Sequence, residues 1–515
     1  MLLGEILRKN ARPEMFGGKP ALIFGDRTWT YSELNRFVNQ MANVLRASGV
    51  GKRDRVAALG RNSDTYVALY FALAKLGAIM VPVNFWYRAD EIRYTLDKSG
   101  SRWLVAEDRF RQIAETAAAT TVEPVQILSY GDESASGLEA LLASASDAEP
   151  DASVSEDDPH IILYTSGTTG FPKGATFSHR AHFLHAVAWA LQTGQRAHDV
   201  GVVVYPLFHT GGPDCLVLPH FLVGGTVVVQ DGADPVQILR AVQRHGLTNI
   251  FCVPTVWRWI LAELDHAEGV GRPYDVSPVR RCLGSSDTLP PDLLGGILAR
   301  FDAEVWVTYG LTEAGCILTY SRLTREDHSR INTVGKPHPL VELSIVNPEG
   351  RDVAPGEVGE VVARGPTLMS GYWNLPERTS ETMADGWLHS GDLGRYDDAG
   401  NVIIAGRLKD MIVSGGEKIY PIEVERLLRQ HPKIKDAALI GVPDEEWGQA
   451  VLAVVVLEPD QDLTADEVIA YVRTHLAGYK RPRYVEFVES LPVTTATNKV
   501  QKSVLRERFA AKGRR

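Results

Sequence analysis

Cysteine is scarce in this chain, with only four among 515 residues. The four stand far apart, with no CxxC or His-Cys cluster: Cys215, Cys252, Cys282 and Cys316. This spacing argues against a structural zinc site and against a disulfide scaffold. It favours a reducing, cytoplasmic setting.

The chain also lacks a long apolar run and an excess of positive charge. Its most apolar region, 201–229, is interrupted by proline, histidine and aspartate, whereas a membrane-spanning helix needs about 20 mostly apolar residues. The apolar run after Met1 is broken by Glu5 and is too short for a signal peptide. The formal net charge is −10, and nucleic-acid binding requires a basic surface. We therefore expect neither integral membrane association nor a nucleic-acid partner.

What is present resembles the composition of an ordinary globular enzyme, 44% hydrophobic and 23% charged. Helical spacings alternate with short strand-like runs up to about residue 405, apart from a polar surface connection at 132–159, which predicts an α/β fold with a largely parallel sheet. Capping-box patterns at Thr30–Glu33 and Thr464–Glu467 predict two helix starts. After residue 409 the pattern predicts a smaller α+β domain, so the expected domains are 1–408 and 409–515.

The most informative segment is the loop YTSGTTGFPKG at 164–174, which follows the apolar run 161–163. Ligands bind beyond strand ends in open α/β sheets, glycines let backbone N–H groups approach phosphates, and a lysine adds charge. It differs from a Walker A motif because Pro172 precedes the lysine and Gly174 follows it. The alternative is an ordinary turn. The residues predicted to bind phosphate are Thr165, Ser166, Gly167, Thr168, Thr169, Gly170 and Lys173.

Four further motifs follow in order: YGLTE at 309–313, WLHSGD at 387–392, GRLKD at 406–410 continued by SGGEKIYPIEVE at 414–425, and LPVTTATNKV at 491–500. With the glycine-rich loop they resemble the adenylate-forming superfamily, which comprises acyl- and aryl-CoA synthetases, peptide-synthetase adenylation domains and beetle luciferases. The resemblance covers almost the whole chain. It implies a large N-terminal domain of parallel α/β subdomains plus a distorted β-barrel, followed by a small mobile α+β C-terminal domain.

The resemblance implies roles for the residues of the YGLTE motif. Glu313 would bind Mg²⁺, Thr312 would contact the α-phosphate, and Tyr309, next to Gly310, would stack on adenine. A buried structural tyrosine is the alternative for Tyr309. Near adenine the chain carries Gly284-Ser285-Ser286-Asp287 where relatives usually have small apolar residues. Ser285 and Asp287 thus add hydrogen-bonding groups beside the adenine or the acid.

The resemblance also implies roles for the later motifs. Asp392 and Arg407 would bind the ribose hydroxyls, although alone they could be a turn residue and a surface charge. Lys409 would be a hinge. One orientation of the small domain would bring Lys499 over the forming bond, and the other would place Gly415 and Gly416 along a tunnel for the pantetheine thiol.

The acid itself is expected beside 205–212, the sequence YPLFHTGG. There His209 would stand at the carboxylate, with a structural histidine as the alternative. The absence of aspartate from 205–212 argues against an amino-acid substrate. The mostly apolar segments 208–218 and 314–320 suit a medium- or long-chain, or a bulky hydrophobic, acid. The residues expected at the reacting groups are Lys499, Glu313, Thr165 and His209.

The sequence therefore predicts an acyl-CoA synthetase that uses ATP, Mg²⁺ and coenzyme A to activate a carboxylic acid through an acyl-adenylate. One alternative is an enzyme that loads a carrier-protein phosphopantetheine, and another is an aryl-acid CoA ligase. A non-catalytic nucleotide-binding relative would be expected to have lost Lys499, Glu313 or Asp392, and all three are present. A homodimer would be compatible with this function.

Overall fold

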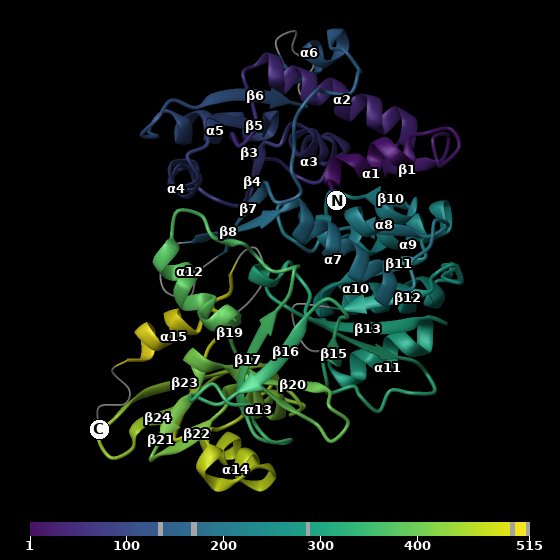
Figure 1. Cartoon of the computed structure of the whole chain (residues 1–515). Coiled ribbons are helices and arrows are strands. Elements are labelled where there is room, and N and C mark those ends of the chain that lie inside the picture. Colours follow the sequence, from purple (N-terminus) through teal and green to yellow (C-terminus); the bar gives the residue numbers. More distant parts are fainter. Residues whose placement is uncertain (132–136, 166–171, 285–288, 495–499, 511–515) are drawn as a thin grey trace. The chain divides into compact units, whose positions relative to one another are not determined.

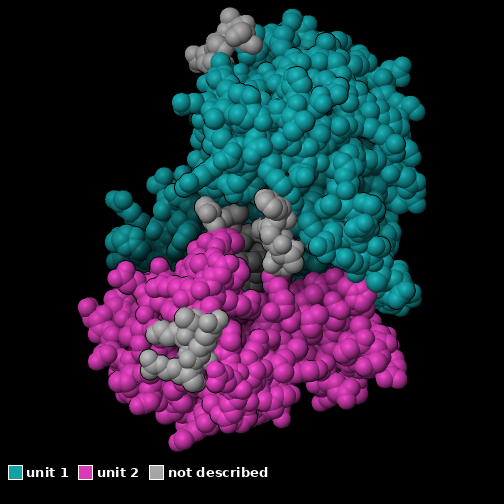
Figure 2. Space-filling view, turned by 90° about the vertical axis from the view of Figure 1, so that its left-hand side faces the viewer, with its two compact units in different colours: residues 1–343, 363–388 teal, residues 344–362, 389–515 magenta. Residues whose placement is uncertain are grey.

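The structure is a computed structural model, and it describes residues 1–131, 137–165, 172–284, 289–494 and 500–510. Packing divides the chain into two compact units, coloured separately in Figure 2. Unit 1 comprises Met1–Leu343 and Ala363–Leu388, and unit 2 comprises Ser344–Val362 and His389–Arg515. The predicted domain boundary at residue 409 marks a hinge. Because a division by packing does not locate a hinge, this boundary stays a prediction.

The first sheet of unit 1 has the strand order β15-β14-β13-β12-β11-β9-β10-β1-β2 (Figure 1). Its interior pairs, from β13 to β1, are parallel, and antiparallel pairs lie at both edges. The bounds are β1 Pro20–Phe24, β2 Arg27–Thr30, β9 Val200–Val203, β10 Thr226–Val229, β11 Asn249–Cys252, β12 Arg281–Gly284, β13 Glu304–Tyr309, β14 Thr319–Leu323 and β15 Lys336–Pro337.

The second sheet of unit 1 has the strand order β18-β8-β7-β4-β3-β5-β6. It is parallel from β7 to β6, and β8 and β18 add antiparallel strands at one edge. The bounds are β3 Arg55–Leu59, β4 Ile79–Val83, β5 Trp103–Glu107, β6 Gln126–Tyr130, β7 Pro159–Thr165, β8 Lys173–Ser178 and β18 Gly371–Tyr372.

Helices connect these strands, as expected for parallel pairs. The central α3 is buried almost all round, which explains why its sequence is apolar on every face. The helices of unit 1 are α1 Leu3–Asn10, α2 Tyr31–Ala47, α3 Asp64–Leu76, α4 Ala89–Ser99, α5 Arg111–Ala118, α6 Leu138–Ser144, α7 His179–Gln192, α8 Leu218–Val223, α9 Pro235–His245, α10 Pro254–Gly269, α11 Pro291–Arg300 and α12 Pro376–Thr382.

In its described residues, unit 2 is built mainly from antiparallel strands and three helices. The distorted β-barrel implied by the resemblance stays a prediction; a sheet in the order β16-β17-β19-β20 is described, most of it in unit 2. The bounds are β16 Glu342–Val346, β17 Gly359–Arg364, β19 Leu388–Tyr396, β20 Val402–Arg407, β21 Ile412–Ser414, β22 Glu417–Ile419, α13 Pro421–Leu428, β23 Ile434–Asp444, β24 Gly448–Leu457, α14 Ala465–His475, β25 Tyr484–Phe487 and α15 Lys502–Phe509.

The fold class predicted from the sequence is confirmed: a large α/β unit is followed by a smaller α+β one. Both capping boxes are present. The side chain of Thr30 accepts from the Glu33 N–H, and that of Thr464 accepts from the Glu467 N–H. No helix in the described part of the chain is both long and apolar enough to cross a membrane.

Candidate functional site

The glycine-rich loop joins the ends of two antiparallel strands. Thr165 closes β7 and Lys173 opens β8, and the two residues stand opposite each other in the ladder. The Thr165 hydroxyl donates to the Lys173 carbonyl at 3.4 Å. This pairing fixes the base of the loop at the end of a strand, as predicted from the sequence. The predicted phosphate-binding residues Ser166, Gly167, Thr168, Thr169 and Gly170 lie outside the described residues.

At the base of this loop, Lys173 and Glu313 both contact the side chain of Tyr372. The Lys173 ammonium lies 4.4 Å from the centroid of the Tyr372 ring. On the same side chain, the Tyr372 hydroxyl donates to Glu313 Oε1 at 2.8 Å. Burial, and then the Glu313 charge, raise the pKa of Tyr372, so its hydroxyl remains a donor throughout the neutral range. The fold thus brings together two predicted site residues that are 140 positions apart.

The segment that carries Tyr372 also holds the backbone of Glu313. Glu313 lies in the single turn Thr312–Ala314, and its carbonyl accepts from the Met369 N–H at 2.9 Å. Two residues further on, β18 pairs with β8, with Tyr372 opposite Ala175. Because successive strand residues face opposite sides, this register decides which way Tyr372 points.

Tyr309 and Gly310 lie at the end of β13, just before this turn. Tyr309 is half-buried and pairs with Thr319 across the ladder. A Cβ on Gly310 would overlap the carbonyl oxygen of Cys316. A close approach of two backbone segments therefore accounts for this glycine, independently of any ligand.

In unit 2, Asp392 and Arg407 face each other across β19 and β20. Arg407 Nε lies 2.9 Å from Asp392 Oδ1; the aspartate is 5% exposed, whereas the arginine side chain is 43% exposed. The carboxylate of Glu360 holds the preceding residues of β19, since it accepts from Gly391 N–H at 3.0 Å and bonds the His389 ring at 2.9 Å. The predicted ribose pair is thus brought together by the pairing of β19 with β20.

The segment after Arg407 contains the predicted hinge and the Gly-Gly pair. Lys409 is exposed, and desolvation followed by the positive charges of Arg407 and Arg506 lowers its pKa despite Asp410. Gly415 and Gly416 form the two-residue turn of the β21–β22 hairpin, with φ of +59° and +85°. Hairpin turns with two positive φ values favour glycine. This turn chemistry alone explains both glycines, so their predicted tunnel role stays a prediction.

The predicted acyl-pocket segment carries an aromatic cluster. The ring centroids of half-buried His209 and buried Phe208 are 4.6 Å apart. Phe208 also meets Phe85 and Trp86 edge-on, at 5.2 and 5.8 Å. His209 therefore lies in a mainly apolar setting.

The two predicted pocket walls belong to one apolar cluster. Residues of both segments pack together in it, among them Leu216, Val217, Leu218, Ala314, Ile317 and Leu318. The other predicted residues Ser285, Asp287 and Lys499 lie outside the described residues.

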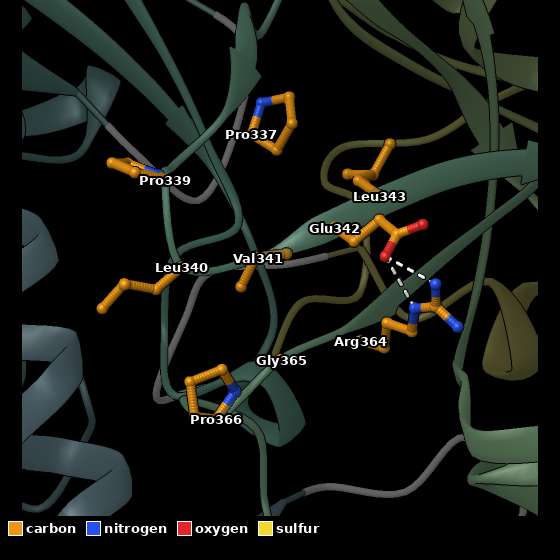
Figure 3. A pocket seen from close by; sticks show the side chains of 9 residues that line it. All are labelled: Pro337, Pro339, Leu340, Val341, Glu342, Leu343, Arg364, Gly365 and Pro366. Carbon is orange, nitrogen blue, oxygen red and sulfur yellow. Dashed lines mark hydrogen bonds and ion pairs between the residues drawn. The ribbon is translucent and has the colours of Figure 1, made fainter.

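A separate groove of about 680 Å³ in unit 1 is lined by prolines and by the Arg364–Glu342 ion pair, whose Nε and Oε2 atoms are 2.7 Å apart (Figure 3). The described residues predicted for the site are not among those that line it.

Sequence reasoning missed Tyr372 and Glu360. Each bonds a predicted residue or its neighbour, Tyr372 from 59 positions after Glu313 and Glu360 from 31 positions before Gly391. Neither stands in a recognisable motif, so only the fold reveals them.

Comparison with known proteins decides the family. The AMP-binding enzyme model matches residues 8–373, and the model of the AMP-binding enzyme C-terminal domain matches 423–499. The chain belongs to the AMP-binding enzyme family. The resemblance to adenylate-forming enzymes inferred from the motifs is thereby confirmed.

Other members of the AMP-binding enzyme family match over nearly their whole length. Feruloyl-CoA synthase from Amycolatopsis sp is 39% identical, with 97% of each chain covered. Fatty acid–[acyl-carrier-protein] ligase ScoC from Streptomyces coeruleorubidus is 36% identical, over 95% of this chain and 93% of that one. Among solved structures, ATP-bound MatB from Rhodopseudomonas palustris has a TM-score of 0.90, at 30% identity and full coverage of both chains.

Proposed function

We propose that the protein is an ATP-dependent carboxylic acid–CoA ligase. In the first step a carboxylate oxygen attacks the α-phosphorus of ATP and pyrophosphate leaves, giving an acyl-adenylate. In the second step the thiol of coenzyme A attacks the acyl carbon and AMP leaves, giving a thioester. The observation that carries the proposal is the contact of Lys173 and Glu313 with the same tyrosine at the base of the glycine-rich loop.

This arrangement suits the first step for an electrostatic reason. A carboxylate and a triphosphate are both anions, so their approach requires positive charge at the site. Lys173 supplies one fixed charge, and the Tyr372 ring below it limits where the ammonium can move. Lys173 would therefore bind oxygens of the triphosphate and of the departing pyrophosphate.

The chemistry around Glu313 fits Mg²⁺. Magnesium is usually bound by one or two carboxylates together with substrate phosphates, and Glu313 is a partly exposed carboxylate next to the loop base. When bound there, Mg²⁺ would neutralise charge on the phosphates. Tyr372, by donating to one carboxylate oxygen, would orient the other toward the metal.

The remaining predicted residues would bind the nucleotide and the acid. Asp392 would accept from the ribose hydroxyls, held in place by Arg407. Tyr309 would stack on adenine, and Thr312 would contact the α-phosphate. Lys499 would lie over the forming bond, and Thr165 and His209 would border the reacting groups.

For the acid we propose a bulky hydrophobic or aromatic carboxylic acid, or a medium- to long-chain one. The two wall segments share an apolar cluster, and the aromatic group of Phe85, Trp86 and Phe208 adjoins His209. A feruloyl-CoA synthase is 39% identical to the chain, which supports an acid of this class.

The test is mass spectrometry on a mixed carboxylic-acid library with ATP and Mg²⁺, with and without coenzyme A. We expect acid-dependent pyrophosphate and AMP, and thioesters of a few apolar acids. The variant Glu313→Gln should lose pyrophosphate release, whereas Glu342→Gln, which changes an exposed carboxylate outside the site, should keep it. ATP binding without pyrophosphate release for any acid would overturn the proposal.

A carrier-protein thiol is the second candidate acceptor, because a fatty acid–[acyl-carrier-protein] ligase is 36% identical to the chain. Acyl-adenylates that persist with coenzyme A but are consumed by a phosphopantetheinylated carrier protein would favour it. A cytoplasmic setting and a homodimer stay predictions from the sequence.

A further inference from the structure

Two of the four cysteines meet in the interior of unit 1. The Cys215 thiol donates to Cys316 Sγ with the sulfurs 3.2 Å apart, although 101 positions separate the residues. Cys215 lies in the π-helical turn Pro213–Val217, and Cys316 follows the turn that contains Glu313. The contact therefore joins the two predicted walls of the acyl pocket.

The two residues differ in exposure, and their thiols differ in acidity. Cys215 is completely buried, and burial raises its pKa, whereas Cys316 is partly exposed. The hydrogen bond from Cys215, and to a smaller extent one from Thr210, lowers the pKa of Cys316, although burial acts in the opposite direction. Since the thiolate is the nucleophilic form, Cys316 is the reactive partner and Cys215 the proton donor beside it.

The backbone holds Cys316 in an unusual conformation. Its φ is +98°, in the region that favours glycine. Its carbonyl oxygen lies so close to Gly310 that a Cβ atom at position 310 would overlap it. A non-glycine residue in this region is strained, so the surrounding structure must enforce the conformation. In this conformation the Cys316 sulfur contacts that of Cys215.

The other two cysteines differ from this pair. Cys252 and Cys282 lie in the regular strands β11 and β12, fully buried, and burial raises the pKa of both thiols. Their ladder partners are Gly284 and Ile250, respectively, so the two cysteines are not opposite each other. They serve as matched internal controls.

We propose that Cys215 and Cys316 form a peroxide-reactive dithiol site that is converted to an intramolecular disulfide. The Cys316 thiolate attacks one oxygen of hydrogen peroxide, the O–O bond breaks, and the departing hydroxide takes up a proton to leave as water. Cys215 then loses its proton and attacks the sulfur of the Cys316 sulfenic acid, so that the S–S bond forms and a second water leaves. Two thiols and one peroxide give one disulfide and two waters.

The disulfide would also alter the proposed acid activation, an effect that rests on the proposed function. A disulfide is about 2.0 Å long, so the two sulfur atoms must approach by roughly 1 Å, which shifts the side chains and pulls on both wall segments. Displacement of that size near reacting groups can lower a rate about a hundredfold. Because Cys316 is three residues after Glu313, we expect acid-dependent pyrophosphate release to fall at least about tenfold and to return with dithiothreitol.

The test treats the full-length protein with hydrogen peroxide, removes the oxidant with catalase, and counts thiols in denaturant. We expect the count to fall from four to two, with one cross-linked peptide joining Cys215 to Cys316, lighter by two hydrogen atoms. Cys252→Ala and Cys282→Ala should still lose two thiols. Cys215→Ser should form no cross-link and should instead accumulate a sulfenic acid that dimedone traps at Cys316.

Retention of four thiols, a cross-link between other cysteines, or over-oxidation of Cys316 in the unaltered protein without a disulfide would each overturn the proposal. The thiol count and the linked peptide need no enzymatic activity, so they stand apart from the proposed function. If Cys215→Ser fails to fold, the unaltered protein and the two control variants still decide the result.

Discussion

The hydroxyl of Tyr372 offers a single-atom test of the site. The substitution Tyr372→Phe removes the hydrogen bond to Glu313 at 2.8 Å and leaves the ring under Lys173. A hydrogen bond to a charged group is worth about 1.5–3 kcal/mol. We therefore expect acid-dependent pyrophosphate release to fall about 10- to 150-fold.

The assay follows pyrophosphate release over a series of Mg²⁺ concentrations at saturating ATP and acid. If Tyr372 orients Glu313, the Mg²⁺ concentration for half-maximal rate should rise, whereas the KM for the acid should stay unchanged. Burial raises the pKa of Tyr372 above its usual value of 10.0. The hydroxyl therefore stays protonated below pH 10, and the variant's defect should not depend on pH across the neutral range.

The chain supplies a matched control. Tyr274 donates to Glu263 Oε1 at 3.0 Å, and among the described residues this tyrosine–glutamate pair has no predicted site residue as a partner. Tyr274→Phe removes the same kind of bond and should leave the rate within about twofold of wild type. Wild-type activity of Tyr372→Phe at every Mg²⁺ concentration, or an equal loss in both variants, would refute the assigned role of Tyr372.

Three further outcomes are expected. Gly415→Ala should destabilise the chain by roughly 1–3 kcal/mol in denaturant unfolding, because φ is +59° and a methyl group would overlap Trp447; Gly416→Asn has open space and should cost less. Burial lowers the pKa of His220 to about 4. In the unfolded chain this histidine takes up a proton near pH 6.5, whereas in the folded chain it does so only near pH 4. The free energy of unfolding therefore falls as the pH drops from about 6.5 to 4. The variant His220→Gln should show a smaller fall in thermal melts. Lys499→Ala should slow adenylation by orders of magnitude and spare thioester formation from supplied acyl-adenylate; equal losses in both half-reactions would contradict its role.

Elements set by neighbouring residues could be predicted from the sequence. The helices after Thr30 and Thr464 begin where their capping boxes place them. In each case the deciding interactions join residues within four positions of one another.

Contacts between distant segments could not be predicted in this way. Tyr372 reaches Glu313 only through the β18–β8 pairing, and Cys215 meets Cys316 only because two turns pack together. Gly415 shows the opposite difficulty: the motif indicated a ligand tunnel, whereas a tight hairpin already requires glycine there.

The position of β18 in the chain has a consequence for protein synthesis. Its residues Gly371–Tyr372 complete the edge of a sheet whose neighbouring strand, β8, ends at Ser178. A ribosome adding about 5–20 residues per second needs roughly 10–40 s to cover that interval. During that time the backbone groups of β8 that later pair with β18 have no native strand partner, and unpaired strand edges promote association between chains. Nascent chains that stall between β8 and β18 should therefore need a chaperone more than the completed chain does.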